Sequence, residues 1–207
     1  MQSNSASKPN VVVVLIDNQS YFELSRNGHQ IVKTPRMDRL AEEGVTFSDF
    51  YARPFCSPSR TALLTGRYAL RAGVHNTVGG VSILHKKEKT IADFLKEAGY
   101  RTGIFGKWHL GDTEGRYPTD QGFDEWYGVP RSSDRAYWPD SDIFQKGSHP
   151  GAVFTHVMSG ERGQKPRELE VYGRAKRATI DREITDHAID FIKRKARAKQ
   201  PFFAFLP

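Results

Sequence analysis

The residues best suited to chemistry lie within residues 55–67, a stretch that contains Cys56, the single cysteine among 207 residues. Ser57 is a good helix N-cap and Pro58 suits a first helical position, so we expect a helix that begins just after Cys56. Unpaired N–H groups and the helix dipole favour negative charge at such an N-terminus. Arg60, one turn into the helix, can lean back toward the same place. This stretch is therefore suited to hold an anionic ester beside a thiol.

Lys107 and His109 form a second group, in the run Gly-Lys-Trp-His-Leu-Gly. In an extended segment, side chains two residues apart lie on the same side. A lysine at this place could neutralise an anion, and a histidine could transfer a proton. Taken by themselves, a lysine and a histidine in a glycine-rich loop are more often ordinary surface residues.

Asp17 and Asn18 form a third group, at the end of an apolar run. Open α/β sheets place their ligands at the carboxyl ends of strands, which is where this pair is expected to lie. If the pair stood alone, a simple Asp-Asn turn would be the better interpretation.

Apolar runs and helix caps predict the elements that must position these groups. We expect strands over residues 11–16, 45–51, 101–105 and 202–206, and helices over residues 35–44, 90–99 and 180–192. The first run is rich in valine, as in a strand buried on both faces, and the second strand delivers Cys56. This alternation predicts an α/β fold with a mainly parallel sheet flanked by helices on both faces. The last strand is expected to leave an unpaired sheet edge.

The remaining regions carry weaker signals. Residues 1–8 are polar, so we expect a disordered tail. Residues 111–175 are rich in Gly, Pro, Asp and aromatic residues, which predicts a long, loop-rich excursion over the sheet edge. Six residues could line a pocket, although ordinary loop packing is the simpler interpretation: His75, Trp126, Arg131, Tyr137, Trp138 and Asp142.

The composition excludes several classes of protein. No apolar run approaches the roughly 20 residues of a membrane span, and one cysteine excludes an internal disulfide. The net charge of +7 would suit an anionic substrate, but it does not separate sulfate, phosphate and nucleic acid. We interpret the basic residues as solvated, and expect no nucleic-acid and no membrane partner. The N-terminus lacks an export signal, so the chain is cytoplasmic as written, or its start lies upstream.

Two of these motifs together resemble the sulfatase family. The run Cys-Ser-Pro-Ser-Arg at residues 56–60, followed by Leu-Thr-Gly-Arg at residues 64–67, is similar to the family signature, and residues 106–111 match a second segment. The resemblance covers nearly the whole chain and implies the alkaline-phosphatase-like fold. It also implies that a maturation enzyme, which reads Cys-x-Pro-x-Arg, converts Cys56 to formylglycine.

The resemblance assigns roles to four catalytic candidates. The aldehyde made from Cys56 hydrates to a geminal diol, of which one hydroxyl attacks sulfur and the other later expels sulfate. Lys107 would bind the sulfate oxygens, and His109 would hold or deprotonate the diol hydroxyl. Arg60 would orient the diol and screen the negative charge of the site.

The resemblance also implies one Ca²⁺ ion, held by Asp17, Asn18 and the converted Cys56. The family has a second aspartate where this chain has Asn18, and an amide oxygen can still coordinate Ca²⁺ with one negative charge less. After the strand that corresponds to residues 202–206, the family has a histidine, an Asp-Asn pair, a lysine and a C-terminal subdomain. This chain contains none of them. We therefore expect residues 9–207 to be the N-terminal portion of a catalytic domain, truncated at the C-terminus and weakly active or inactive alone.

The resulting hypothesis is a sulfatase that hydrolyses a small-molecule or carbohydrate sulfate ester to an alcohol or phenol and inorganic sulfate. Its protein partner would be the formylglycine-generating maturation enzyme. Two alternatives remain open. One is a phosphonate or phosphate ester hydrolase of the same superfamily, and the other is a non-catalytic remnant that binds sulfated glycans.

Overall fold

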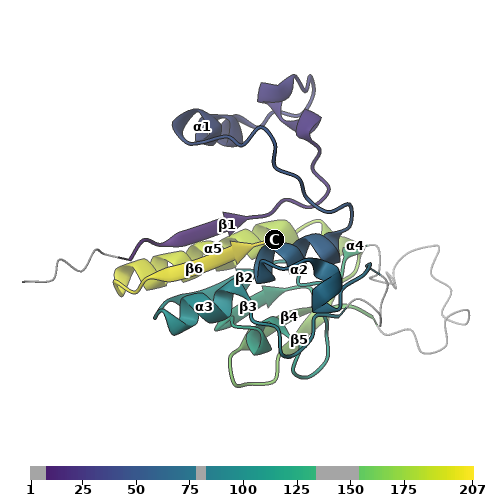
Figure 1. Cartoon of the computed structure of the whole chain (residues 1–207), viewed down its shortest axis with the longest axis vertical. Helices are drawn as coiled ribbons and strands as arrows, with labels where there is room; N and C mark the ends of the chain where they lie inside the picture. The colour runs from purple at the N-terminus through teal and green to yellow at the C-terminus, as the bar shows by residue number, and fades with distance from the viewer. Residues whose placement is uncertain (1–7, 78–82, 134–153) are drawn as a thin grey trace, which may run out of the picture. The chain divides into compact units, whose positions relative to one another are not determined.

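The structure of the chain is a computed structural model that describes residues 8–77, 83–133 and 154–207 (Figure 1). Its contacts divide the chain into two compact units, of which the smaller is residues 16–53. The larger unit holds a six-stranded sheet, and the smaller unit holds one α-helix and two short 3-10 helices. Within these described ranges, no helix is both long and apolar enough to span a bilayer.

The strands of the larger unit form one sheet, in the order β1-β6-β2-β3-β4-β5. They are β1 (Val11–Val14), β2 (Arg101–Phe105), β3 (Glu125–Gly128), β4 (His156–Glu161), β5 (Arg167–Val171) and β6 (Phe202–Leu206). The pairings β1–β6, β6–β2 and β2–β3 are parallel, whereas β3–β4 and β4–β5 are antiparallel. The predicted α/β fold with a mainly parallel sheet is confirmed, and an antiparallel pair of strands extends it at one edge.

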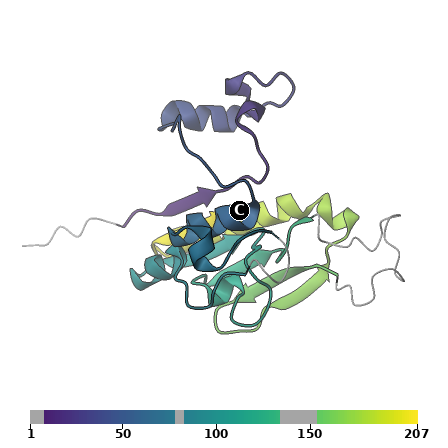
Figure 2. The ribbon, with the colours of Figure 1, turned by 45° about the vertical axis from the view of Figure 1, so that its right-hand side comes forward.

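Helices cover both faces of this sheet (Figures 1 and 2). They are α2 (Cys56–Thr65), α3 (Ile91–Glu97), α4 (Arg174–Arg177) and α5 (Ile180–Arg197), with the 3-10 helices η3 (Ala69–Ala72) and η4 (Pro118–Asp120). Helices α2 and α3 lie on one face, and α5 lies on the other. The helices expected over residues 90–99 and 180–192 are confirmed, and the second of them continues to Arg197.

Strand β6 contributes to the cores on both faces of the sheet. Phe203 and Phe205 lie in the cluster that includes residues of α2 and α3. Phe202 and Ala204 lie in the other cluster, with Phe191 of α5. Because successive side chains of a strand point to opposite faces, one apolar strand can fill both cores when both faces are covered.

Two expectations about the strands are wrong. Strand β6 is not an unpaired edge, because it pairs with β1 on one side and with β2 on the other. The strand at this edge of the sheet is β1, and it is partly buried on one face only: Val11 and Val13 pack against the core, whereas Val12 and Val14 are 49% and 63% exposed. Helix α5 packs against β2, β3 and β6. The run of valines correctly predicts the strand β1. Whether both faces of that strand are buried depends on the helices that pack beside it, which the run itself does not determine.

The smaller unit, residues 16–53, is built around α1 (Pro35–Glu43), preceded by η1 (Tyr21–Glu23) and η2 (Ser25–Asn27). The Asp38 carboxylate accepts hydrogen bonds from the hydroxyls of Ser25 and Thr34, which tie α1 to the loop before it. The helix expected here is confirmed. The strand expected over residues 45–51 does not form. Alternating apolar residues are insufficient for a strand, which needs a neighbouring strand to accept its main-chain hydrogen bonds.

The region 111–175 contains more regular structure than its composition indicates. Strands β3, β4 and β5 lie within it and extend the sheet beyond β2. Strand β5 is exposed along its whole length, and only Leu169 and Val171 give its sequence an apolar alternation. Residues 1–7 and 134–153 lie outside the described residues, and with them lie most of the expected tail and the pocket candidates Tyr137, Trp138 and Asp142.

A hydrogen-bonded carboxylate joins α5 to its neighbours. Glu183 accepts hydrogen bonds from Lys176 Nζ at 2.8 and 3.0 Å, from the Tyr127 hydroxyl at 2.7 Å and from the Thr179 hydroxyl at 2.8 Å. These bonds favour the ionised carboxylate, that from Lys176 most of all, and lower the pKa of Glu183 from 4.5 to about 2. Glu183 thereby ties α5 to strand β3, which carries Tyr127.

We expect this carboxylate to make the folding stability depend on acid pH. Because the pKa of Glu183 is lower in the folded protein, its stabilising contribution is complete above a pH of about 4.5 and is lost as the pH falls toward about 2. In Glu183→Gln, the curve of melting temperature against pH should be flatter over this interval. Asp186→Asn, at an exposed carboxylate of the same helix, should leave the curve unchanged. An unaltered slope in Glu183→Gln would show that this carboxylate does not link stability to pH.

Candidate active site

Cys56 is the first residue of α2, and Phe55 is its N-cap. The helix therefore begins earlier than expected, and Ser57 and Pro58 are its second and third residues instead of its N-cap and first residue. A proline is tolerated at this place because the first four N–H groups of a helix have no partner within the helix. Cys56 lies at the end of the helix where these N–H groups favour negative charge.

The segment that follows β2 faces the first turn of α2. Main-chain hydrogen bonds fix this segment to the chain after β3: the Trp108 N–H donates to the Val129 carbonyl at 2.9 Å, and the His109 N–H donates to the Pro130 carbonyl at 3.0 Å. The Trp108 indole is buried and donates to the Arg116 carbonyl at 2.8 Å. The segment thus continues from the carboxyl end of β2, where open α/β sheets place their ligands.

Three contacts join α2 to this segment. Cys56 Sγ lies 3.3 Å from His109 Nδ1. The Ser57 hydroxyl donates to the His109 carbonyl at 2.9 Å, and Arg60 Nη1 donates to the Lys107 carbonyl at 2.6 Å. The four residues predicted to be catalytic therefore come from two segments that are in direct contact, with Lys107 held through its main chain.

Arg60 brings a buried positive charge to this contact. Its side chain is among the most deeply buried large ones in the protein, with 2% of the residue exposed. A buried guanidinium is costly unless it is hydrogen-bonded or paired with negative charge, and the Lys107 carbonyl supplies one such bond. The surroundings of Cys56 therefore favour an anion.

His109 adopts an unusual backbone conformation. Its φ of +60° lies in the left-handed region, which is uncommon for residues other than glycine and costs about 1–3 kcal/mol. Hydrogen bonds hold the residue on both sides, through its amide to Pro130 and through its carbonyl to Ser57. The segment is therefore not extended at His109 as the sequence alone indicated, and the ring approaches Cys56 from a turn of the chain.

The predicted metal ligands do not complete a site among the described residues. Asp17 and Asn18 belong to the smaller unit, and Asn18 has a φ of +58°, which asparagine tolerates better than most residues. Their oxygens suit Ca²⁺, but two residues supply fewer than the about six to eight oxygens that this ion takes. The described ranges contain no group of three or more His, Cys, Asp or Glu side chains that could hold a metal. Asp17 and Asn18 could therefore supply only part of a Ca²⁺ ligand set.

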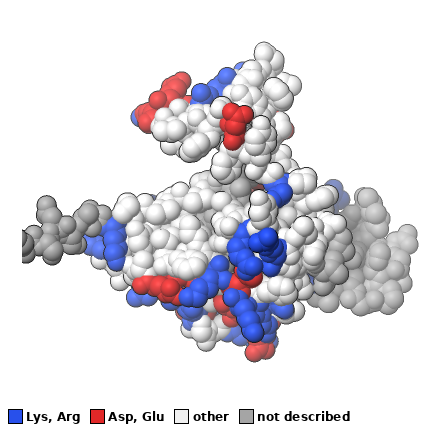
Figure 3. Space-filling view, in the orientation of Figure 1, with Lys and Arg blue, Asp and Glu red and all other residues white. Residues whose placement is uncertain are grey.

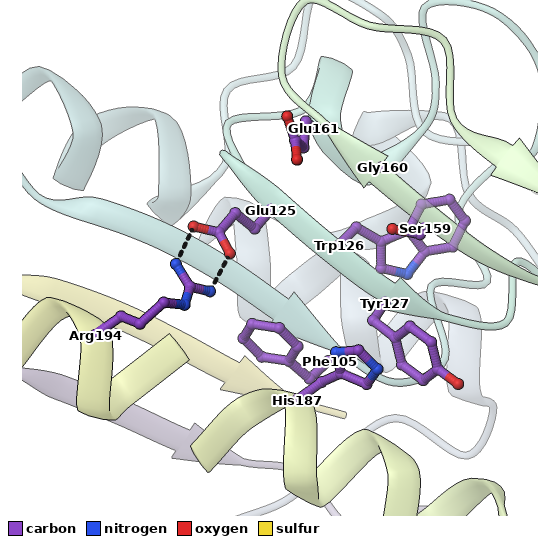
Figure 4. A pocket seen from close by; sticks show the side chains of 9 residues that line it. All are labelled: Phe105, Glu125, Trp126, Tyr127, Ser159, Gly160, Glu161, His187 and Arg194. Atoms are coloured by element: carbon purple, nitrogen blue, oxygen red, sulfur yellow. Dashed lines mark hydrogen bonds and ion pairs between the residues drawn. The ribbon is translucent and has the colours of Figure 1, made fainter. Parts of the chain in front are cut away.

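A cavity of about 80 Å³ lies at a different place, between α5 and strands β2, β3 and β4 (Figure 4). Arg194 donates two hydrogen bonds to Glu125 there, at 3.2 and 2.6 Å, and Lys195 Nζ lies 2.9 Å from the same carboxylate. Burial raises the pKa of Glu125, but these basic groups outweigh burial and lower it. None of the four predicted catalytic residues lines this cavity. The ion pairs of Glu125 with Arg194 and Lys195 join α5 to β3.

The other pocket candidates among the described residues have ordinary surroundings. Arg131 forms an ion pair with Asp112 at 2.5 Å, which ties the loop after β3 to the chain after His109. Trp126 is buried in the core on the α2 and α3 side of the sheet, and it also lines the cavity of Figure 4, as a pocket residue was expected to do. His75 is exposed.

Sequence reasoning missed the contact made by Ser57. A serine at this position was expected to cap its own helix, whereas its hydroxyl donates to a carbonyl 52 residues farther along the chain. No local signal separates these two uses of a hydroxyl, because only the packing of α2 against the segment after β2 brings the His109 carbonyl within reach.

Comparison with known proteins places this geometry in a family. Residues 9–207 match the family model described as Sulfatase. The N-acetylgalactosamine-6-sulfatase of Canis lupus familiaris is 34% identical over 215 residues, which cover 95% of this chain and 38% of that protein. The crystal structure of the PsFucS1 sulfatase from Pseudoalteromonas sp. matches with a TM-score of 0.83 at 27% identity, over 96% of this chain and 43% of the other. That of Ps i-CgsB in complex with k-i-k-neocarrahexaose matches with a TM-score of 0.76 at 32% identity, over 96% of this chain and 44% of the other.

These matches confirm the fold expected from the sequence, which is the alkaline-phosphatase-like fold of sulfatases. The chain spans about two fifths of the length of the curated relatives it matches, 38% in the case of the canine protein. The match to the family model includes both motifs, around Cys56 and around His109. By its sequence motifs, its fold and its relatives, the chain belongs to the sulfatase family.

Proposed function

We propose that the protein containing this chain hydrolyses sulfate esters through a formylglycine made from Cys56. The observation that carries the proposal is the contact of 3.3 Å between Cys56 Sγ and His109 Nδ1, next to the buried Arg60. Membership of the sulfatase family supports the reaction class. A thiol at a helix N-terminus would not by itself indicate this function. The contact with His109 and the family membership are both needed.

The geometry around Cys56 suits an attacking hydroxyl. The maturation enzyme oxidises Cys56, with an external oxidant such as molecular oxygen, so that an aldehyde replaces the thiol on the same carbon, and addition of water gives two hydroxyls. Their oxygens take the place that Sγ occupies, so His109 Nδ1 comes within hydrogen-bond distance of one of them. The imidazole can accept the proton of that hydroxyl while its oxygen attacks sulfur. The bond between sulfur and the ester oxygen breaks, and the ester oxygen takes a proton from water and leaves as the alcohol.

The second hydroxyl releases the product. It loses its proton, its electrons form the C=O bond, and the C–O bond to the sulfate breaks. Sulfate leaves and the aldehyde is regenerated, so no second attack at sulfur is needed. This is why a diol serves better here than the single hydroxyl of a serine.

Three groups would bind the negative charge of the ester and of the departing sulfate. The N-terminus of α2 offers its free N–H groups, and the buried Arg60 adds a full positive charge at one turn's distance. Lys107, which is half-buried next to His109, is the third group in the proposal. These three groups would select an anionic ester over a neutral one.

Sulfated carbohydrates are the substrate class that the relatives support. One relative is an N-acetylgalactosamine-6-sulfatase, and one structural neighbour was solved with a neocarrahexaose. Because this chain spans only part of such relatives, we assign residues 9–207 to the N-terminal portion of the catalytic domain, with little activity alone. The Ca²⁺ ion belongs to this proposal through Asp17 and Asn18, whose oxygens fit it as part of a larger ligand set.

The alternative functions differ in whether Cys56 is converted and in what the basic residues bind. A phosphate or phosphonate ester hydrolase would use the same formylglycine, and a glycan-binding remnant would not form it. The charge distribution gives a nucleic-acid role little support: on the face in Figure 3, Lys and Arg side chains lie beside Asp and Glu side chains. Of the exposed basic residues, Arg67 is paired with Glu88 at 2.5 Å.

Coexpression with a formylglycine-generating enzyme should convert Cys56 to the aldehyde, because Cys56, Pro58 and Arg60 supply the motif that this enzyme reads. Mass spectrometry of the peptide that contains residue 56, combined with an aldehyde-reactive label, measures the conversion. Cys56→Ala should abolish the label, and Ser59→Ala, which leaves the motif intact, should retain it. A thiol that persists in the unsubstituted protein would favour the glycan-binding alternative.

In the full-length protein that contains this sequence, His109→Ala should lower kcat for an aryl sulfate by about 10²–10⁴-fold, with a smaller change in KM, because it removes a proton acceptor from the attacking hydroxyl. His75→Ala, at an exposed histidine of the same unit, should leave both constants unchanged. Faster hydrolysis of an aryl phosphate than of an aryl sulfate would argue against a sulfatase and for the phosphate ester hydrolase.

A further inference from the structure

Helix α2 holds the main chain of the segment after β2, not only its side chains. The Ser57 hydroxyl donates to the His109 carbonyl at 2.9 Å, and Arg60 Nη1 donates to the Lys107 carbonyl at 2.6 Å. Both donor residues are buried, with Ser57 at 0% exposure and Arg60 at 2%. The bond from Ser57 to His109 is buried at both ends, since His109 is 8% exposed, so solvent would not replace the Ser57 hydroxyl if it were lost.

The two donors are three residues apart and so lie on one face of the helix. Their two acceptors are two residues apart on one segment. Two hydrogen bonds of this kind fix both the distance and the rotation of α2 relative to the segment, which a single bond could not do. The bond made by Ser57 is the one that ends on the residue whose ring faces Cys56.

His109 needs such a restraint more than its neighbours do. A histidine rarely adopts a φ of +60°, so without outside contacts its main chain would return to a more favourable conformation. The Pro130 carbonyl holds its amide at 3.0 Å, and the Ser57 hydroxyl holds its carbonyl at 2.9 Å. A change in this backbone would move the ring away from Cys56 Sγ, which now lies 3.3 Å from Nδ1.

We infer that Ser57 is a positioning residue whose hydroxyl holds the backbone of His109 in its left-handed conformation and so keeps Nδ1 against the reactive atom of residue 56. The hydroxyl is available for this because Phe55, not Ser57, is the N-cap of α2. Arg60 holds the neighbouring carbonyl but also carries charge, whereas removal of the Ser57 hydroxyl leaves the charge of the site unchanged. The catalytic meaning of this inference rests on the proposed function, but the contact itself can be measured on the unconverted thiol.

The test measures the alkylation of Cys56 by iodoacetamide in the unconverted 207-residue chain, where it is the single cysteine. In this reaction the S–C bond forms, iodide leaves, and the thiol proton passes to an acceptor, because the thiolate is the nucleophile. An imidazole at hydrogen-bond distance accelerates the reaction near neutral pH by accepting this proton. At strongly alkaline pH hydroxide can accept the proton in place of the imidazole, so the rate there reports access to the sulfur.

Ser57→Ala should lower the rate near neutral pH by roughly threefold to tenfold, the effect of losing one buried hydrogen bond, and leave the alkaline rate unchanged. The matched control is Thr65→Val, which removes a hydroxyl that donates within α2, to the Thr61 carbonyl at 2.7 Å. It should leave both rates unchanged. Equal losses in the two variants would indicate a general weakening of the helix and overturn the inference. An unchanged neutral rate in Ser57→Ala would overturn it too, and so would a higher alkaline rate, which would show local opening.

This readout also separates the inference from the proposed function. If Ser57→Ala changes the pH profile as expected while the full-length protein fails to hydrolyse sulfate esters, the positioning role stands and the proposed function fails. If the full-length protein hydrolyses sulfate esters and Ser57→Ala leaves the profile unchanged, the function stands and the positioning role fails.

Discussion

The docking of the first turn of α2 on the segment after β2 is the constraint on which the site depends. Cys56 and His109 are separated by 53 positions in the chain, and neither segment could place them 3.3 Å apart by itself. Apolar burial supplies most of the attraction: Leu64 of α2 and Trp108 of the segment are buried in one core, and such a side chain contributes about 1.5–3 kcal/mol. The hydrogen bonds, at about 0.5–1.5 kcal/mol each, contribute less energy but set the orientation.

The sheet fixes the position of the segment that contacts α2. Strand β2 is paired on both sides, with β6 and with β3, and the main-chain bonds to residues 129 and 130 extend that pairing to His109. On the opposite face, α5 is joined to β3 through Tyr127 and Glu183, and through Glu125 and Arg194. The reactive residues thus lie where the strands end, on a sheet that helices cover on both faces and that hydrogen-bonded charged groups join to α5 on one of them.

The parts of this structure that could be predicted from sequence are those that depend on neighbours along the chain. Thr90 and Asp93 form a capping box within four residues, and α3 begins where it was expected. Two predictions were wrong, a strand over residues 45–51 and the burial of β1 on both faces. Both features depend on which distant element packs beside the segment. The catalytic candidates came from the resemblance of two motifs to a family. The left-handed turn at His109 and the bond from Ser57 arise from contacts across 52 positions, for which a single sequence gives no signal. The role of Asp17 and Asn18 stays a prediction.

The position of β6 between β1 and β2 has a consequence for how this protein is made. The Phe202 amide donates to the Asn10 side chain across 192 positions, and β1 has β6 as its partner in the sheet. While the ribosome is still adding the intervening residues, the valines of β1 lack β6, their partner strand, because β6 is translated only after those residues. Contacts over such separations form slowly, and an apolar segment that waits for them is prone to aggregate. The N-terminal strand is therefore where we would look for a chaperone on the nascent chain.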